Sequence, residues 1–419
     1  MSKKVVIIGG GVIGFSCAYY CLRAGHDVTV VERGAPDRDC CSIGNAGMVV
    51  PSHFIPLAAP GMVEMGIRMM GDPESPFYIR PRLDFDLADW GMNFIRSATA
   101  EHVDASGPLL RDLQMASRGE FVRLAKEPGF EFGLKKNGLL MLCRTRHALS
   151  VEKHVAEDAN QLGIPAELLT ASETAKLDPD VEMDIEGSVY FPKDCHLRPE
   201  QFLQSLIHFV KSNGGSVLWN NAFQCWIQHA DGTVSAECQS GVLDADYVVV
   251  AGGAYSPGLA KPLGLHLPMQ AGKGYSLTVS KPIQLPKICS ILTEARAAVT
   301  PMGNALRFGG TMEIAGLDTS INPQRIRGII KAAPKYFPQF KSEHFEGIKP
   351  WAGLRPCSPD GLPYIGPTRT VKNLLIATGH AMLGLSLAPS TGQVISDLVS
   401  GRTPKFDLRL LSPGRYLGW

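Results

Sequence analysis

The sequence predicts an α/β protein in which a nucleotide-binding domain is interleaved with a second, strand-rich domain. At the N-terminus a strand, a glycine motif and a helix follow one another directly, which is typical of a nucleotide-binding βαβ unit. From Gly272 the pattern changes to short strands that favour an antiparallel sheet, and α/β character returns at Trp351. Because 419 residues exceed what one hydrophobic core usually holds, we expect two domains.

The βαβ unit occupies the first 32 residues. Val5–Ile8 is a β-branched run that predicts a buried strand, Gly9–Gly14 contains four glycines, and Phe15–Ala24 has the pattern of a helix. A second strand, Asp27–Val31, runs directly into Glu32. This carboxylate follows the last glycine by 18 residues, near the spacing of about 20 at which it can accept a hydrogen bond from a ribose hydroxyl.

Each glycine of the motif has a physical role in binding a dinucleotide. Gly9 permits the tight turn, Gly11 lets backbone amides approach a pyrophosphate, and Gly14 lets the helix pack closely on the strand. The helix N-terminus supplies partial positive charge to the phosphates. The unit alone does not determine whether the dinucleotide is FAD or NAD. Its candidate cofactor-binding residues are Gly9, Gly11, Val12, Ile13, Gly14, Glu32 and Arg33.

Composition favours small-molecule chemistry. Hydrophobic residues make up 45% and charged residues 19%, and 41 basic against 40 acidic side chains leave a net charge of +1, so nothing attracts nucleic acid in bulk. The ten cysteines show neither CxxC pairs nor a metal-ligand spacing, so we expect reduced thiols and no metal. Without a secretory segment or an apolar run of about 18 residues, we expect a cytoplasmic protein, with peripheral contact at the inner face of the cell membrane left open.

Apolar periodicity and proline or glycine breaks predict the remaining elements. Three helical stretches, Met62–Met70, Leu87–Ala98 and Leu109–Ala125, predict an inserted helical region. The later pattern predicts strands at Gly138–Leu142, Gly187–Pro192, Gly214–Trp219, Ala245–Ala254, Tyr275–Val279, Ala297–Thr300, Leu306–Phe308 and Leu374–Thr378, and helices at His147–Leu162, Pro199–Ser212 and Pro389–Leu398.

Two glycine-containing segments are further candidates for cofactor contact. The loop Cys40–Met48 consists mainly of small residues and follows the βαβ unit closely, although an ordinary surface turn would have the same composition. Its candidates are Ser42, Asn45, Ala46 and Gly47. The hydrophobic strand that begins at Ala245 ends in Ala251 and Gly252, where ligands of parallel sheets gather.

Several motifs in the same order resemble the FAD-dependent D-amino-acid oxidase superfamily, and among its members the bacterial D-amino-acid dehydrogenases, in their small subunit, are the most similar. The resemblance runs nearly end to end. Besides the amino-terminal glycines it rests on Gly44–Gly47, Ala58–Gly61, Lys273–Thr278, Gly353–Pro356, Asp360–Gly361, Thr378–His380 and Ser400–Pro404.

The resemblance implies noncovalent FAD in a Rossmann-like domain of the glutathione-reductase type, and an α+β substrate domain built on a mixed or antiparallel sheet. It also places the segment from Gly379 to Asp397 beside the isoalloxazine ring, with Gly379, His380, Leu383 and Gly384 as contacts. The expected division is 1–60, 195–262 and 349–419 for the FAD-binding domain, and 61–194 and 263–348 for the substrate domain.

Three residues are the catalytic candidates. Arg355 stands where the family binds the substrate carboxylate, a role that suits the planar guanidinium; a structural salt bridge is the alternative. Tyr275 is expected to add a hydroxyl near the substrate, or else to be a core aromatic. His53 departs from the family, which has another aromatic residue in this loop, so it either alters substrate choice or is a solvated histidine.

The function implied is oxidation of a free D-amino acid, with D-proline or D-hydroxyproline among the candidates, by hydride transfer from Cα to flavin N5. The electron acceptor is then a quinone or an electron-transfer chain. One alternative is a glycine or sarcosine oxidase that uses O2. Others are the flavin-carrying part of a larger electron-transfer complex and, less favoured, a nicotinamide dehydrogenase.

Overall fold

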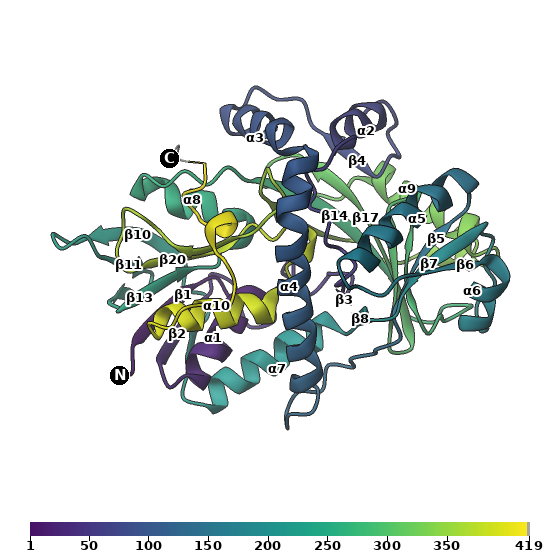
Figure 1. Ribbon diagram of the computed structural model, residues 1–419. Coiled ribbons are helices and arrows are strands. Elements are labelled where there is room, and N and C mark those ends of the chain that lie inside the picture. Colours follow the sequence, from purple (N-terminus) through teal and green to yellow (C-terminus); the bar gives the residue numbers. More distant parts are fainter. Residues whose placement is uncertain (417–419) are drawn as a thin grey trace.

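The computed structural model, which describes residues 1–416, is built around two sheets that lie at opposite ends of the molecule (Figure 1). The first has six strands. β9, β2, β1, β13 and β20 are parallel, and β19 adds an antiparallel edge next to β20. These strands are β1 (Lys4–Ile8), β2 (Asp27–Val31), β9 (Ser216–Leu218), β13 (Tyr247–Val250), β19 (Tyr364–Pro367) and β20 (Leu374–Thr378).

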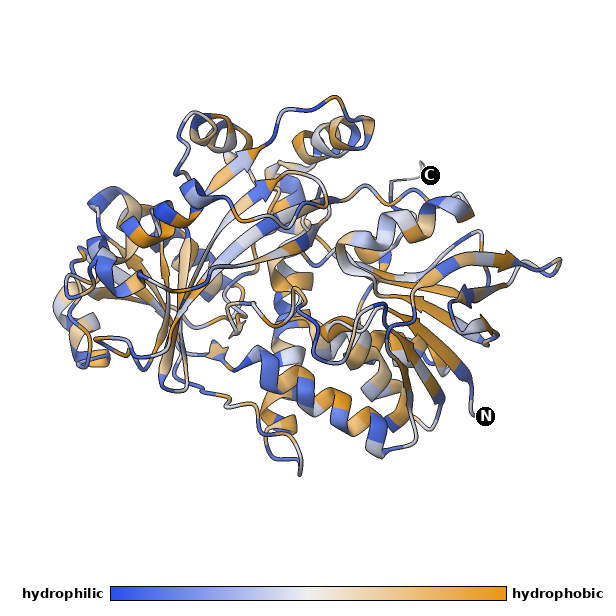
Figure 2. Ribbon diagram, turned by 180° about the vertical axis from the view of Figure 1, so that it is seen from behind, coloured by the Kyte–Doolittle hydropathy of each residue, from blue (hydrophilic) through white to orange (hydrophobic). Residues whose placement is uncertain are grey.

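Three helices pack together against one face of this sheet: α1 (Val12–Arg23), α7 (Pro199–Ser212) and α10 (Ala388–Val399). Gly392 lets α10 cross α1 closely, because a Cβ there would lie 2.6 Å from the carbonyl oxygen of Ser16. Tyr19 of α1 packs on Phe209 of α7, with ring centroids 4.5 Å apart. The strands of this sheet are mainly apolar, as expected for a parallel sheet covered on both faces (Figure 2).

The other face is covered by a small antiparallel sheet and a short helix. Val234 and Ala236 of the small sheet pack with Val248 and Val250 of β13 in one hydrophobic cluster. The elements are β10 (Phe223–Gln228), β11 (Val234–Cys238), β12 (Gly241–Leu243) and α8 (Ser256–Ala260).

The second sheet is larger and mixed. Along it the order is β18, β14, β17, β16, β15, β5, β7, β6, and β4 pairs with β17. The strands are β4 (Phe77–Ile79), β5 (Leu139–Cys143), β6 (Glu167–Thr170), β7 (Gly187–Phe191), β14 (Gln270–Val279), β15 (Cys289–Leu292), β16 (Ala297–Met302), β17 (Ala305–Ile314) and β18 (Trp351–Cys357). β3 (Met48–Val49) and β8 (Cys195–His196) form a separate two-stranded ladder.

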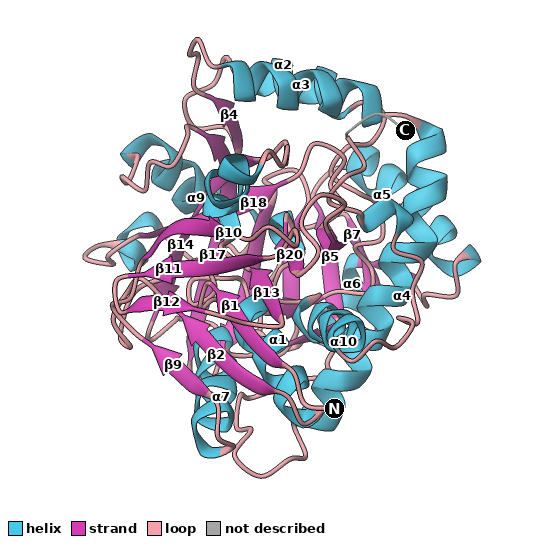
Figure 3. Cartoon of the chain, turned by 90° about the vertical axis from the view of Figure 1, so that its left-hand side faces the viewer, coloured by secondary structure: helices cyan, strands magenta, loops and turns pink. Residues whose placement is uncertain are grey.

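Helices surround the larger sheet and connect it to the smaller one. α9 (Pro323–Tyr336) packs on one face, and α4 (Ala100–Leu124) runs between the two sheets (Figure 1). Figure 3 shows α2 and α3 at the same end of the molecule. The remaining helices are α2 (Met62–Met69), α3 (Phe85–Ser97), α5 (Arg146–Gln161) and α6 (Ala171–Leu177), with 3-10 turns at Gly253–Tyr255, Lys261–Leu263, Ser342–Phe345, Ala381–Leu383 and Arg409–Leu411.

The structure differs from the sequence-based elements at identifiable places. α1 begins at Val12 rather than Phe15, because Gly11 already serves as its extended N-cap and Gly14 lies in the first turn. α4 begins at Ala100 and continues through Pro108, so the predicted start at Leu109 is wrong. α9 and β15 were not predicted. The segment 349–419 was predicted to belong to the FAD-binding domain, but its first strand, β18, pairs with β14 of the larger sheet. Residues 417–419 of this segment lie outside the described part of the chain. The domain boundaries otherwise stay a prediction.

A buried ion pair anchors the C-terminal segment. Arg415 Nε lies 2.6 Å from Asp360 Oδ2 and Nη2 lies 2.8 Å from Oδ1, and both side chains are less than a tenth exposed. Burial by itself would raise the pKa of Asp360, but the charge and hydrogen bonds of Arg415 outweigh it and lower that pKa. Arg415 also lies over the ring of Tyr364, 3.9 Å from its centroid.

Replacing Arg415 by Met should lower the free energy of unfolding by about 3–5 kcal/mol, because it leaves the Asp360 carboxylate buried and unpaired. Denaturant unfolding at pH 7 measures the change. Arg409→Met removes an exposed pair with Asp407 and should cost under about 1 kcal/mol. In the wild type the ionised Asp360 contributes to the free energy of unfolding. This contribution is complete above the pKa that Asp360 has in the unfolded chain, and it is lost as the pH falls through the lower pKa of the folded protein. Equal effects of the two substitutions would contradict the anchoring role.

Candidate active site

Residues from both sheets line one large cavity of about 1420 Å³. Its wall includes the glycine turn after β1, the loop 40–46, the chain that follows β13, the segment 380–385 and one face of the larger sheet. Pockets that hold a single small ligand usually measure about 300–1,000 Å³. This cavity is large enough for a dinucleotide together with a small substrate.

The glycine turn permits close backbone approach at the nucleotide end of the cavity, which we define by residues 9–13 and 31–34. Gly9 has a φ of +114°, and a Cβ on it would lie 2.4 Å from the carbonyl oxygen of Ala251. A Cβ on Gly14 would lie 1.9 Å from the carbonyl oxygen of Gly9. At the start of α1, the amide of Val12 donates to Ser42 Oγ at 3.0 Å. The turn thus presents the amides of a helix N-terminus to the cavity.

Glu32 holds this turn from the end of β2. Its two carboxylate oxygens accept hydrogen bonds from the amides of Gly10 and Gly34, each at 2.8 Å. Arg38 Nε lies 3.3 Å from Glu32 Oε2. Arg33 lies over the ring of Tyr255, 3.9 Å from its centroid. Glu32 borders the cavity, so one side chain can both order the glycine turn and face a ribose.

Most of the residues predicted to contact a cofactor line this cavity. Gly14, Gly47 and Gly379 do not; they permit close packing behind the wall instead. Those that line it are Gly9, Gly11, Val12, Ile13, Glu32, Arg33, Ser42, Asn45, Ala46, Ala251, Gly252, His380, Leu383 and Gly384.

The segment 380–385 leads into α10 and borders one part of the cavity. We call this part the ring end, because the resemblance described above predicts the isoalloxazine ring beside this segment. The side chain of His380 is buried, with Nε2 2.9 Å from Thr391 Oγ1, and burial lowers its pKa to about 3. Ala381 has a φ of +47°, a strained conformation for a residue with a Cβ. The backbone beside the cavity is therefore held in place by the buried histidine.

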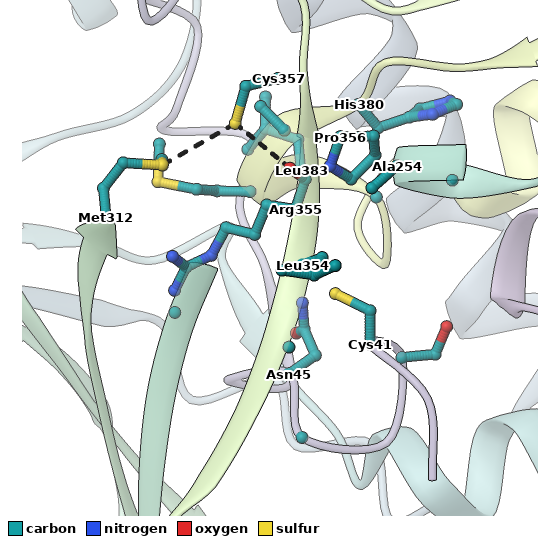
Figure 4. A pocket seen from close by; sticks show the side chains of 18 of the residues that line it. Cys41, Asn45, Ala254, Met312, Leu354, Arg355, Pro356, Cys357, His380 and Leu383 are labelled. Atoms are coloured by element: carbon teal, nitrogen blue, oxygen red, sulfur yellow. Dashed lines mark hydrogen bonds between the residues drawn. The ribbon is translucent and has the colours of Figure 1, made fainter. Parts of the chain in front are cut away.

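Arg355 faces the cavity from β18 without a carboxylate partner among residues 1–416. Its Nη1 donates to the carbonyl oxygen of Thr311 at 2.6 Å, and burial lowers its pKa. The titratable groups that act on it are the thiols of Cys41 and Cys357. Figure 4 shows the Arg355 side chain in the pocket, with Cys41 and Asn45 of the loop across β18 in that view. A partly buried guanidinium with no carboxylate partner among the described residues favours binding of an anionic group.

Local backbone features hold Arg355 across the sheet. A Cβ on Gly274 would lie 2.2 Å from the guanidinium carbon of Arg355, so the side chain can cross β14 only at this glycine. The β14–β17 register shifts between Lys273 and Tyr275, and Thr311 in this irregularity has a φ of +68°. Thr311, Arg296 and Ala381 are non-glycine residues with positive φ that line the cavity. Backbone strain is thus concentrated at the site.

Tyr275 does not fit the role that we predicted for its hydroxyl. It borders the cavity, but its side chain packs with Leu277 in the hydrophobic cluster under α9, and its hydroxyl donates to Glu313 Oε2 at 2.6 Å. Because side chains alternate along a strand, Tyr275 lies on the face opposite Gly274 and Arg355. The alternative of a core aromatic describes its environment.

His53 lines the cavity and is not a solvated loop residue. Its Nδ1 lies 2.9 Å from Ser52 Oγ, and its carbonyl oxygen accepts a hydrogen bond from Gln114 Nε2 at 2.9 Å. Burial lowers the pKa of its imidazole to about 4, so it is neutral at pH 7.

The sequence did not indicate the residues that hold the loop 40–46. Arg307 Nη1 donates to the carbonyl oxygens of Ile43 and Asn45, at 3.0 and 2.7 Å. The ring of Trp351 fits against Gly44, where a Cβ would lie 2.1 Å from it. Both come from the larger sheet and are far from the loop in sequence, so no local signal connects them to it.

The two-sheet architecture, the glycine turn and the large cavity are those of a dinucleotide-binding protein. Residues 4–398 match the family model described as DAO, FAD dependent oxidoreductase, and the chain belongs to this family. It is 34% identical to a D-amino acid dehydrogenase of Methylobacterium radiotolerans, with 98% of this chain and 99% of the relative covered, and 32% identical to one of Granulibacter bethesdensis, with 99% and 100% covered.

Solved structures share the fold. Glycine oxidase from Geobacillus kaustophilus superposes with a TM-score of 0.80 at 23% identity and covers all of both chains. L-proline dehydrogenase from P. horikoshii superposes with a TM-score of 0.74 at 18% identity, over 99% of this chain and 98% of that one. At these identities the likeness concerns the fold alone. The chain is an FAD-dependent oxidoreductase, and the glycine turn, Glu32 and the cavity volume fit that cofactor.

Replacing Gly14 by Ala should weaken FAD binding at least about tenfold, the equivalent of about 1.4 kcal/mol, because the added Cβ displaces the turn that carries Gly9. The ratio of flavin to protein absorbance and a fluorescence titration measure it. Gly119→Ala is the control, since a Cβ there meets nothing within 4 Å. Full flavin content in Gly14→Ala would contradict this role.

Proposed function

We propose that the protein is a D-amino-acid dehydrogenase that oxidises a free D-amino acid, with D-proline and D-hydroxyproline as the first candidates. The observation that carries the proposal is Arg355, a partly buried guanidinium that faces the cavity without a carboxylate partner in the described chain. The names of relatives at 31–34% identity over nearly the whole chain support the same activity.

Arg355 would bind the substrate carboxylate and orient the Cα hydrogen. Its guanidinium can hold a carboxylate through two parallel hydrogen bonds, which fixes rotation as well as position. FAD, when bound, supplies the acceptor for the hydride that leaves Cα. Much of the rate gain in the hydride transfer comes from positioning of the substrate and from exclusion of water. The product is an imino acid, which water hydrolyses afterwards.

The wall of the cavity near the large sheet favours a compact, mainly apolar substrate. Met65, Met141 and Ile291 line it, and unbranched methionine side chains adapt to irregular shapes. Such a wall suits the ring of a cyclic secondary amine. The preference for a cyclic substrate rests on these lining side chains, because the fold alone does not determine the substrate.

The proposed electron acceptor is a quinone or another component of an electron-transfer chain, because the relatives are named dehydrogenases. Among residues 1–416 no helix combines the length and apolar character needed to cross a bilayer. An oxidase of glycine or sarcosine remains the alternative. The reduction of an artificial quinone, compared with oxygen consumption under the same conditions, separates the two.

Replacing Arg355 by Leu should raise KM for the amino acid about 10²-fold, equivalent to about 3 kcal/mol for lost charge-assisted hydrogen bonds, while FAD stays bound. Steady-state kinetics and the flavin absorbance of the purified variant measure the two effects. Arg146→Leu is the control, because Arg146 is 90% exposed on α5. An unchanged KM in Arg355→Leu would remove the assignment.

Anaerobic mixing with D-amino acids should bleach the visible absorbance of the bound flavin, because two electrons enter it from the substrate. The panel contains D- and L-amino acids with both enantiomers of proline and the hydroxyproline isomers. We expect bleaching by the D-series. Bleaching by the L-series alone, or by none of the panel with FAD present, would contradict the proposed function.

A further inference from the structure

Three side chains form a hydrogen-bonded chain that leads from the cavity into the protein interior. His53 lines the cavity, its Nδ1 lies 2.9 Å from Ser52 Oγ, and Ser52 Oγ donates to Asp194 Oδ2. The backbone amide of Ser52 donates to the other carboxylate oxygen of Asp194 at 3.1 Å. Asp194 is 0% exposed and lies between β7 and β8, 142 residues away from Ser52 along the chain.

The partners fix the direction of these hydrogen bonds. An ionised Asp194 can only accept, so the Ser52 hydroxyl donates to it. The serine oxygen then accepts from His53, which places the imidazole proton on Nδ1. Nε2 of His53 is left with a lone pair, and no described residue forms a hydrogen bond with it. This nitrogen is therefore available as a proton acceptor to a molecule in the cavity.

The loop is anchored beside the ring end of the cavity. The amide of Val50 donates to Ser386 Oγ at 3.0 Å, and Ser386 in turn donates to Gln114 of α4, which holds the carbonyl oxygen of His53. Ser386 directly follows the cavity-lining residues Leu383–Leu385. The loop that carries His53 is thus fastened beside the segment that we expect to border the flavin ring.

The surroundings of Asp194 let its carboxylate accept a proton near neutral pH. Burial raises its pKa to about 7, while its hydrogen bonds with Ser52 and the charge of Arg118 act against the rise. The thiols of Cys195 and Cys289 lie near Asp194; burial and the charge of Asp194 raise their pKa values, so both are neutral at pH 7. His53 is affected by burial alone.

We propose that His53, Ser52 and Asp194 form a proton relay that deprotonates the substrate ammonium before oxidation. This inference rests on the proposed function. The N–H bond of the ammonium breaks and its proton goes to His53 Nε2; the Nδ1 proton goes to Ser52 Oγ, and the serine proton goes to Asp194. No electrons are transferred in this step. It leaves a neutral amine in the cavity, the form that can release a hydride from Cα.

The relay returns to its starting protonation state by the reverse proton transfers. After the product has left, the Asp194 proton passes back through Ser52 and His53 to water in the cavity. Neither Ser52 nor Asp194 lines the cavity, so His53 is the group through which they communicate with it. His53 is the catalytic residue in this scheme, and the other two are positioning residues that act through it.

The test is the pH dependence of anaerobic flavin bleaching by D-proline, or by whichever amino acid bleaches the wild type fastest. In the wild type the rate should rise with an apparent pKa near 7. Ser52→Ala, Asp194→Asn and His53→Asn should each lose about 10²-fold or more at pH 7.5, as expected for loss of general base catalysis. Their rates should recover at higher pH, toward the pKa of the free amine.

Two further variants separate a relay from a structural role. Ser52→Thr keeps the hydroxyl and should keep the wild-type pH profile. Asp178→Asn removes another buried carboxylate, one that accepts from the backbone amides of Lys287 and Ile288 and does not line the cavity, and it should leave the profile unchanged. Flavin content and thermal midpoint are recorded for every variant, so that a folding defect is seen separately.

A second readout does not depend on turnover. Wild-type holoenzyme reduced anaerobically with dithionite can bind D-proline without oxidising it, and calorimetry in two buffers of different ionisation enthalpy counts protons. At pH 8 we expect no net proton release for the wild type and about one for Asp194→Asn. Superimposable pH profiles of wild type and Asp194→Asn, or equal proton counts, would overturn the relay. Bleaching of the wild type by D-amino acids would leave the proposed function intact in that case.

Discussion

Arg355 brings a positive charge to the cavity wall, and no carboxylate among residues 1–416 pairs with it. Arg355 can lie across the larger sheet only because Gly274 has no side chain, and the carbonyl oxygen of Thr311 accepts its hydrogen bond. A guanidinium that is partly removed from water and has a single neutral acceptor gains from an anionic partner, which makes an anionic ligand its natural partner. The positive φ of Thr311 and the register shift beside it are thus explained by the site rather than by the sheet.

The nucleotide end of the cavity depends on a different constraint, the close approach of backbone segments. Gly9, Gly14 and Gly392 each stand where a Cβ would overlap a carbonyl oxygen, so the turn, α1 and α10 pack directly on one another. Glu32 adds polar contacts by accepting from two amides of the turn. The nucleotide end is therefore held within the first sheet, while Arg307 and Trp351 of the larger sheet fasten the loop 40–46 from the other side.

These two regions meet at the loop that carries His53. This loop follows the loop 40–46 in the chain. Gln114 and Ser386 fasten it, and Ser52 donates to Asp194, which comes from a distant part of the chain. Polar groups buried at such a junction stay hydrogen-bonded, and the direction of their hydrogen bonds determines which atom faces the cavity. The same contacts that order the loop thereby set the chemistry of its histidine.

The sequence by itself determined the βαβ unit and its glycine motif with Glu32, because both are encoded locally. Arg355 was predicted from the resemblance to the D-amino-acid oxidase superfamily, and the structure places it on the cavity wall. The tertiary structure decided the side chain of Tyr275, which strand alternation turned into the core and toward Glu313. It also decided the partners of His53 and the clamp of Arg307, since both come from residues far away in the chain. Local patterns carry no information about such contacts, because side-chain direction and long-range neighbours are set only when the sheets assemble.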